Sequence, residues 1–210
     1  IIDATFFGRE YGYLCFHDTR RVIYFKEIVS ESVKDLKEGL LILKEAGYVI
    51  KSITIDGRRG YYGNIRKILG NIPIQMCIYH QRAIIRRYIT DRPQSECGIE
   101  LKELSKRITD KENHQLFIDD FYKLKEKYQF YLHERNEAGE FKHQSMRSAF
   151  RSLESNLSNI FIYSDSKTLN IPPTNNHLEG LFSHLKERVN IHRGLRRDRK
   201  KKAVKLILFF

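Results

Sequence analysis

Three carboxylates stand in settings that favour metal chemistry, although they are far apart along the chain: Asp3, Asp56 and Glu179. Asp3 lies inside the apolar run IIDATFF, where a charge is costly unless it is paired or binds a metal. Asp56 ends the run VIKSITIDG, and Glu179 opens the segment NNHLEGLFSHLKERV. Three converging carboxylates suit hard cations such as Mg²⁺ or Mn²⁺. Two such ions about 3.5–4 Å apart can stabilise both the attacking and the leaving oxygen of a phosphoryl displacement.

Each carboxylate also has a purely structural interpretation. Asp56 precedes Gly57, and an aspartate at a strand end commonly forms a turn. Glu179 follows Asn176 at the spacing of a capping box, in which the glutamate bonds back to the cap residue. Against that, the apolar stripe of the same helix would pack on a sheet and hold Glu179, Ser183 and Lys186 on the flanking polar face. The stripe consists of Leu178, Leu181, Phe182, Leu185 and Val189.

The elements that must position these residues begin with three β-rich runs within residues 1–29, which predict an antiparallel meander. The segment SESVKDLKEGLLILKEAGY has near-helical apolar spacing, with Ser30 or Ser32 as its cap and Gly47 at its end. A strand ending at Asp56, a helix over 61–69, a strand over 72–80 and a helix over 81–89 follow. Because the fourth strand is reached through a helical crossover, we expect it to lie parallel to the first.

Residues 93–170 show helical periodicity and few β signals. We interpret them as a helical insertion, with residues 1–92 and 171–210 forming the core domain. The aromatic residues of the insertion are expected to make a small core of its own, and the alternative is stacking on DNA bases. They are Phe117, Phe121, Tyr122, Tyr128, Phe130 and Tyr131.

Composition points to a polyanionic partner. The 38 Lys and Arg residues against 26 Asp and Glu residues give a formal net charge of +12, for which nucleic acid is the commonest partner. The alternative is a basic surface that has no specific partner. Three scattered cysteines do not form a disulfide framework, which favours a reducing setting. No apolar run is long enough to cross a bilayer. Both ends fall within apolar runs, so we expect a fragment of a longer protein.

Four motifs carry a resemblance that covers essentially the whole chain. They are DATFFG with Asp3, SITIDGRRGYYGNI with Asp56, CIYH with Cys77 and His80, and TNNHLEGLFSHLK with Glu179. In this order the chain resembles the catalytic domain of DDE transposases, and within them the Mutator-like transposases of bacterial insertion sequences. The C-x-x-H pair and a helical insertion before the glutamate helix are both typical of that group.

The resemblance implies an α/β domain with an RNase H-like mixed five-stranded sheet, flanked by helices, and an all-helical insertion before the last catalytic helix. It implies that Asp3, Asp56 and Glu179 bind two Mg²⁺ or Mn²⁺ ions and direct cleavage at transposon ends followed by strand transfer into target DNA. Water attacks first, and the freed 3′-hydroxyl then attacks the target. The resemblance also implies a setting in the bacterial cytoplasm near the nucleoid and a possible homodimer, for which the sequence offers no interface pattern. Family members usually carry an N-terminal DNA-binding region, whereas this sequence begins at the first expected catalytic strand, so sequence-specific binding is expected of the longer protein rather than of this fragment.

Further residues are candidates for DNA contact. Asn175 and Asn176 could hold the scissile strand or simply end the loop, and Lys186 could contact DNA or stay solvated. Cys77 and His80 have three interpretations. They could be half of a zinc site, although a structural zinc needs four ligands, or a plain pair in the core. In the third, His80 lies near the active site and contacts phosphate, while Cys77 packs in a strand. The basic candidates are Arg58, Arg59, Arg86, Arg87, Arg193, Arg196, Arg197, Arg199 and Lys200 to Lys202.

Two other functions fit the same residues. One is an RNase H-like nuclease or resolvase that cleaves DNA without strand transfer. The other is a domesticated transposase that binds DNA through its basic surface without cutting it.

Overall fold

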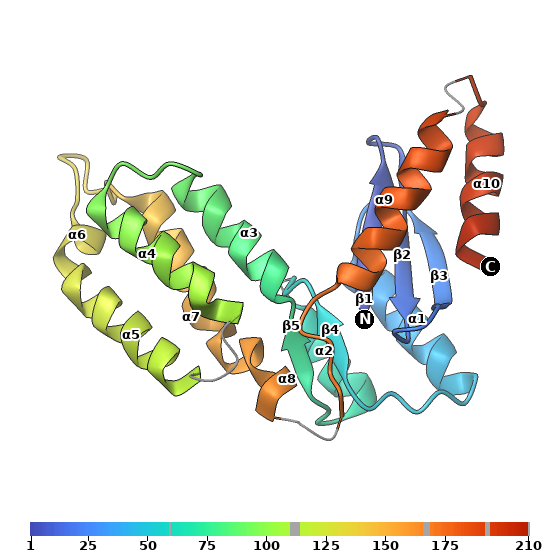
Figure 1. Cartoon of the computed structure of the whole chain (residues 1–210), viewed down its shortest axis with the longest axis horizontal. Coiled ribbons are helices and arrows are strands. Elements are labelled where there is room, and N and C mark those ends of the chain that lie inside the picture. The colour runs from blue at the N-terminus through green and yellow to red at the C-terminus, as the bar shows by residue number, and fades with distance from the viewer. Residues whose placement is uncertain (59, 110–113, 166–168, 192–193, 210) are drawn as a thin grey trace. The chain divides into compact units, whose positions relative to one another are not determined.

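The computed structural model describes residues 1–58, 60–109, 114–165, 169–191 and 194–209. The chain divides into two compact units (Figure 1). Unit 1 comprises Ile1–Ile74 and Thr174–Phe210, and unit 2 comprises Gln75–Pro173. Among the described helices, none combines the length and the apolar character that a membrane span requires.

Unit 1 is built on a three-stranded antiparallel sheet in the order β1-β2-β3. These strands are β1 (Ile2–Phe7), β2 (Tyr11–His17) and β3 (Val22–Ile28). In the register, Asp3 faces Cys15 on β2, and Cys15 faces Phe25 on β3. The predicted antiparallel meander is confirmed.

Helices cover both faces of this sheet, because β2 is apolar on both sides. Tyr11, Tyr13 and Cys15 belong to one buried cluster, whereas Leu14 and Phe16 belong to another. The first cluster includes side chains of α9 (Asn176–Ile191) and α10 (Arg197–Phe209), which run side by side (Figure 1). The second includes side chains of α1 (Val33–Glu45) and α2 (Tyr61–Leu69). Unit 1 is therefore a mixed α/β sandwich of helices, sheet and helices.

Local signals explain where α1 begins and ends. The Ser32 hydroxyl accepts a hydrogen bond from the Asp35 amide (3.1 Å), which satisfies a free amide of the first turn. The helix gives way to Gly47, whose φ of 84° suits a glycine at this position. Leu36, Leu40 and Leu43 are buried against the sheet. Leu41 is exposed, so the predicted helix is confirmed but not every apolar residue of it is core.

The remaining strands are short. β4 (Ile53–Ile55) pairs with β5 (Ile74–Met76) in a two-stranded sheet, and the chain passes from unit 1 to unit 2 within β5. β4 also lies beside β1, with Cα atoms within 8 Å. The five strands described thus form a three-stranded and a two-stranded sheet, rather than the single five-stranded sheet that we expected.

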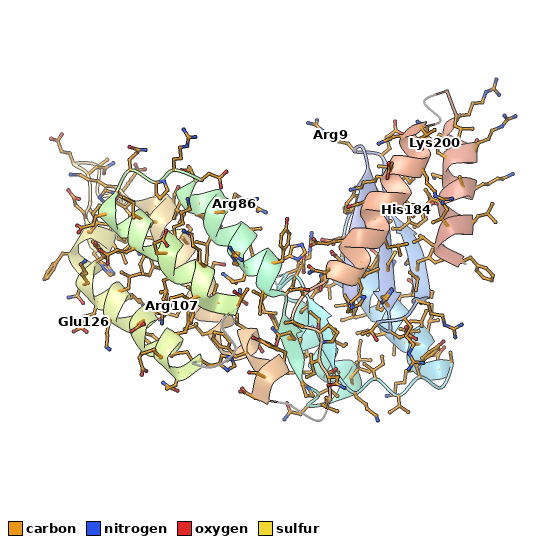
Figure 2. The ribbon with its side chains drawn as sticks, viewed as in Figure 1. Arg9, Arg86, Arg107, Glu126, His184 and Lys200 are labelled. Carbon is orange, nitrogen blue, oxygen red and sulfur yellow. The ribbon has the colours of Figure 1, made fainter. Side chains whose placement is uncertain are left out.

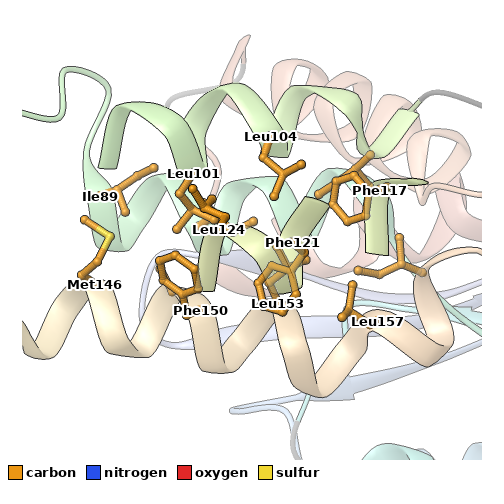
Figure 3. Packing of buried hydrophobic residues seen from close by; sticks show 14 of the residues in the cluster. Ile89, Leu101, Leu104, Phe117, Phe121, Leu124, Met146, Phe150, Leu153 and Leu157 are labelled. Carbon is orange, nitrogen blue, oxygen red and sulfur yellow. The ribbon is translucent and has the colours of Figure 1, made fainter. Parts of the chain in front are cut away.

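Unit 2 is helical and has its own core. Its elements are α3 (Ile78–Ile89), α4 (Glu96–Lys106), a 3₁₀ turn (Arg107–Thr109), α5 (His114–Lys127), α6 (Gln129–His133), α7 (Gln144–Ile160) and α8 (Ile162–Asp165). Figure 3 shows how Phe121, Phe150 and Leu153 pack in the centre of this core. Phe117 and Phe121 are core residues as expected. Phe130 is not, because it is 85% exposed.

The boundary of the helical unit differs from the expected one at residue 93. Helix α3 belongs to unit 2 because Ile85 and Ile89 are buried in the same cluster as Leu153 and Leu157 of α7. A buried hydrogen bond from Asn156 to Gln81 (2.8 Å) adds a polar link between the two helices. The expected strand over 72–80 is also shorter: Ile78 begins α3, and its amide donates to the Pro173 carbonyl (3.0 Å).

Candidate metal centre

Asp3 lies on the sheet face that α9 covers. Ile2 and Ala4 pack into the cluster on the opposite face, so the alternation of β1 turns Asp3 towards α9. Asp3 is 9% exposed, and its Oδ1 accepts a hydrogen bond from the Ala4 amide (2.8 Å). Burial raises the pKa of the neighbouring Cys15 thiol, and the negative charge of Asp3 raises it further.

Glu179 stands in the first turn of α9, at the edge of the packed stripe. Leu178, Phe182, Leu185 and Val189 are buried against the sheet, which confirms the predicted stripe. A carboxylate oxygen of Glu179 lies within 4.8 Å of a carboxylate oxygen of Asp3. The structure therefore brings together two of the three predicted metal ligands, from opposite ends of the chain.

The capping-box interpretation of Glu179 does not hold. The amides of Leu178 and Glu179 donate to the Asn175 carbonyl (2.9 and 3.0 Å), so Asn175 precedes the helix and Asn176 is its first residue. In a capping box the glutamate would accept the amide of the cap residue. The Asn176 amide instead donates to the Thr174 hydroxyl (3.4 Å).

Asp56 forms a turn directly after β4. Its Oδ1 accepts a hydrogen bond from the Arg58 amide (3.0 Å), and Gly57 between them has a φ of 77°. Asp56 thus forms a turn at the end of its strand, as the structural interpretation predicted. Among the described residues, Asp56 does not join a group of three ligand side chains whose atoms all lie within 4.8 Å of one another.

Glu31 is a fourth carboxylate of this region, and the sequence did not indicate it. Its side chain is 11% exposed and forms an ion pair with Arg58, which also donates to the Glu31 carbonyl (3.1 Å). Burial raises the pKa of Glu31, and the charges of Asp56 and Asp3 raise it further, while Arg58 opposes them. Glu31 therefore feels both aspartates at once, which places all three acids in one electrostatic neighbourhood of unit 1.

This donor set fits a magnesium or manganese ion. All four side chains offer hard oxygen ligands. Two oxygens that bind one Mg²⁺ at bond lengths of about 2.1 Å are at most roughly 4.2 Å apart. The upper limit of 4.8 Å between Asp3 and Glu179 is close to that span. Mutual repulsion of the acids would also be relieved by a bound cation.

Comparison with known proteins gives no family. Neither the protein-family models nor the curated proteins match this chain. The function is therefore inferred from the residues and their geometry.

The basic candidates of unit 1 differ in what they contact. Arg58 is held by Glu31, so it is not a free phosphate contact. Arg197 forms an ion pair with Glu10 (3.4 Å) and lies over the Tyr11 ring (5.7 Å). Arg196 and Lys186 are exposed, and neither has a carboxylate partner in the described part of the chain. Arg59 and Arg193 lie outside the described residues.

The basic run near the C-terminus is part of α10 rather than a loop. Lys201 and Lys205 both form ion pairs with Glu27 of β3, and Lys201 also lies over the Tyr11 ring (5.1 Å). Arg199 and Lys202 are exposed and have no ion pair with any described residue. One face of the run thus stabilises unit 1, and the other carries free positive charge. Figure 2 labels Lys200, which begins the lysine run of this helix.

The two members of each remaining candidate pair, Asn175 and Asn176 or Cys77 and His80, have different surroundings. Asn175 is fully buried and its carbonyl accepts the hydrogen bonds that open α9, whereas Asn176 is exposed. Cys77 is a buried cysteine outside any disulfide and lies directly before α3, and His80 lies in the first turn of that helix, with its ring edge-on to Tyr79 (5.9 Å). Neither residue lies in a strand. Cys77 belongs to no group of three metal-ligating side chains among the residues described, so the zinc interpretation has no support.

Proposed function

We propose that the chain is the catalytic domain of a metal-dependent DNA transposase of the DDE type, which cleaves DNA strands at transposon ends and joins them to target DNA. The observation that carries this proposal is the approach of the Asp3 and Glu179 carboxylates within 4.8 Å. Two carboxylates this close repel each other, and a shared divalent cation would offset that repulsion.

The fold supports the proposal at a coarse level. An RNase H-like sheet would extend β1–β3 by β4 and β5 on the β1 side. β4 lies beside β1 and pairs with β5, which agrees with that strand order. Asp56, at the end of β4, then faces the same edge as Asp3. Its coupling to Glu31 agrees with this placement.

The roles follow from these positions. Asp3 and Glu179 would hold a divalent cation, and Asp56 would supply a further carboxylate to the site. When bound, the cations supply Lewis-acid stabilisation of the attacking and leaving oxygens. Arg58 keeps Glu31 and the turn of Asp56 in place through its three hydrogen bonds. The proposed phosphate contacts are His80 of α3 and the outward face of α10, which consists of Arg199 and Lys202.

The experiment supplies duplexes with pre-nicked transposon ends and a supercoiled target plasmid, with Mg²⁺ or Mn²⁺. The expected products are joined molecules, and they disappear with Asp3→Asn, Asp56→Asn or Glu179→Gln. Glu187→Gln, on the exposed part of the same helix as Glu179, is the matched control and keeps the activity. Joining that survives all three site variants would rule out this assignment of the metal ligands.

Other products distinguish the two remaining functions. Metal-dependent nicking without joined products identifies a nuclease or resolvase. DNA binding without cleavage under either metal identifies a binding module. In both cases the transposase proposal is wrong, although only the second outcome removes the catalytic role of the carboxylates.

A further inference from the structure

A pocket of about 280 Å³ lies in unit 2, between α3 and α4. Its floor includes the buried residues Ile85, Ile89 and Ser105. Its rim carries four cations: Arg82 and Arg86 from α3, and Lys102 and Lys106 from α4. Each helix contributes its pair at positions i and i+4, so each pair lies on one helix face and points to the same groove.

Ion pairs and helix C-termini account for Arg86 and Lys106 but not for Arg82 and Lys102. Like charges at i and i+4 destabilise a helix, and here two such pairs face each other across one pocket. Among the described residues, two carboxylates offset them: Asp91 pairs with Arg86 (3.6 Å), and Glu103 pairs with Lys106 (2.6 Å). Arg82 and Lys102 have no carboxylate partner among the residues that the structure describes.

The contacts of Lys102 position it rather than neutralise it. Its Nζ donates to the Asp91 carbonyl, which holds the half-buried side chain at the pocket. A carbonyl does not remove the positive charge, and an ammonium group has further protons to donate. Arg82 on the opposite rim offers a planar fork that matches the oxygens of a phosphate. The two unneutralised cations therefore face one pocket from two helices.

We propose that this pocket is a binding site for a phosphate group of a polynucleotide backbone. The choice of DNA as the polyanion rests on the proposed function, whereas the site itself rests on the four cations. Arg86, labelled in Figure 2, belongs to the site. Its neighbour Arg87 does not line the pocket, although the two residues are indistinguishable in the sequence.

Fluorescence anisotropy on the full chain tests the site, with a labelled DNA duplex, EDTA and a series of salt concentrations. The test variant is Arg82→Gln/Lys102→Gln. Each phosphate contact contributes about 0.9 to the slope of log K against log salt, so the slope should fall by about 1.8. If the affinity at 1 M salt is unchanged, the loss at 0.1 M salt is roughly 60-fold.

The matched control is Arg92→Gln/Arg151→Gln, which removes the same charge from exposed positions outside the pocket. It should change the slope much less than the test variant. An equal change in both variants, or no change in the test variant, would overturn the proposal. The charge-conserving pair Arg82→Lys/Lys102→Arg should retain the slope, and thermal melting of every variant identifies any loss of folding.

Titration with inorganic phosphate at constant ionic strength separates a free anion from a polynucleotide. If wild type binds inorganic phosphate and the test variant does not, while both DNA slopes stay equal, the pocket takes free phosphate and the proposal fails. Because the anisotropy assay needs neither metal nor cleavage, it is independent of the strand-joining assay. Failure of joining with the slope change intact rejects the transposase function alone.

Discussion

Arg58 ties together two carboxylates that repel each other. Its guanidinium forms an ion pair with Glu31 and donates to the Glu31 carbonyl (3.1 Å), while its backbone amide donates to Asp56 (3.0 Å). One residue thus joins the turn after β4 to the segment before α1. The positive charge of Arg58 thus offsets part of the repulsion between Glu31 and Asp56.

The first prediction concerns the strength of this link. A double-mutant cycle with Glu31→Gln and Arg58→Gln should give a coupling energy of about 1–2 kcal/mol, because the carboxylate is largely buried and loses its partner. The exposed pair Lys106–Glu103 is the control and should give at most about 0.5 kcal/mol. Urea denaturation in EDTA measures both. Equal coupling energies would mean that the Arg58 link is an ordinary surface pair.

The second prediction concerns pH. Burial, Asp56 and Asp3 raise the pKa of Glu31 above its usual value of 4.5. The folded state therefore binds this proton more tightly than the unfolded state, and that stabilisation is lost as the pH rises through the raised pKa. From pH 4.5 towards neutrality, wild type should lose free energy of unfolding relative to Glu31→Gln, measured by urea denaturation in EDTA.

Glu100 provides a control of opposite sign. Hydrogen bonds from Lys127 and Tyr128 lower the pKa of Glu100. Its contribution is present above pH 4.5 and is lost as the pH falls through the lowered pKa. The stability advantage of wild type over Glu100→Gln should therefore shrink below pH 4.5. If the pH curves of wild type and Glu31→Gln run parallel from pH 4.5 upwards, Glu31 does not feel the two aspartates as described.

Periodicity predicted much of unit 1. The alternation of β1 and β2 and the stripe of α9 are local patterns, and each fixes which face of the element is buried. Since Asp3 lies on the face that α9 covers and Glu179 lies at the edge of the stripe, these two patterns were enough to predict that their carboxylates approach. The two carboxylates do approach, with oxygens within 4.8 Å of each other.

Other features depend on partners that no local pattern reveals. Glu31 stands between two serines in a segment that reads only as a helix start, and its importance comes from Arg58, which is distant in sequence. The run CIYH has the β-branched and aromatic content of a strand, but the hydrogen bond from Ile78 to Pro173 fits a helix start there. Similarly, Arg86 and Arg87 differ only in where they point once α3 has packed.

The third prediction tests the packing of α1 on the sheet. A Cβ atom added at Gly39 would lie 2.3 Å from Cζ of Phe16. Alanine normally stabilises a helix interior relative to glycine by about 1 kcal/mol. Gly39→Ala should nevertheless destabilise the protein by about 1–3 kcal/mol, because the ring must move in a packed core. Chemical denaturation gives the change in the free energy of unfolding.

Gly63 of α2 is the matched control, because a Cβ atom there would meet no atom within 4 Å. Gly63→Ala should stabilise the protein by up to about 1 kcal/mol. Replacing the ring with the smaller Phe16→Leu should relieve part of the cost of Gly39→Ala. If both glycine variants are stabilised, α1 does not pack as closely on β2 as the structure indicates.

The fourth prediction separates the two faces of α10. Lys201→Gln/Lys205→Gln removes both ion pairs to Glu27, so this variant should have a lower melting temperature. Arg199→Gln/Lys202→Gln removes the same charge from exposed positions without an ion pair. This second variant should keep its melting temperature. If the outward face contacts DNA phosphates, its salt slope for DNA binding should fall by about 1.8.

The comparison is informative because both variants lower the net charge equally. A lysine that already pairs with Glu27 has little charge left to offer a phosphate, since its carboxylate partner offsets the field outside the protein. An attraction that depended only on the net charge would weaken DNA binding to the same extent in both variants. A salt slope that falls only for Arg199→Gln/Lys202→Gln therefore assigns direct contact to the outward face of α10. Equal salt slopes in the two variants would mean that α10 makes no direct phosphate contact through Arg199 and Lys202. Its lysines would then serve to pair with Glu27.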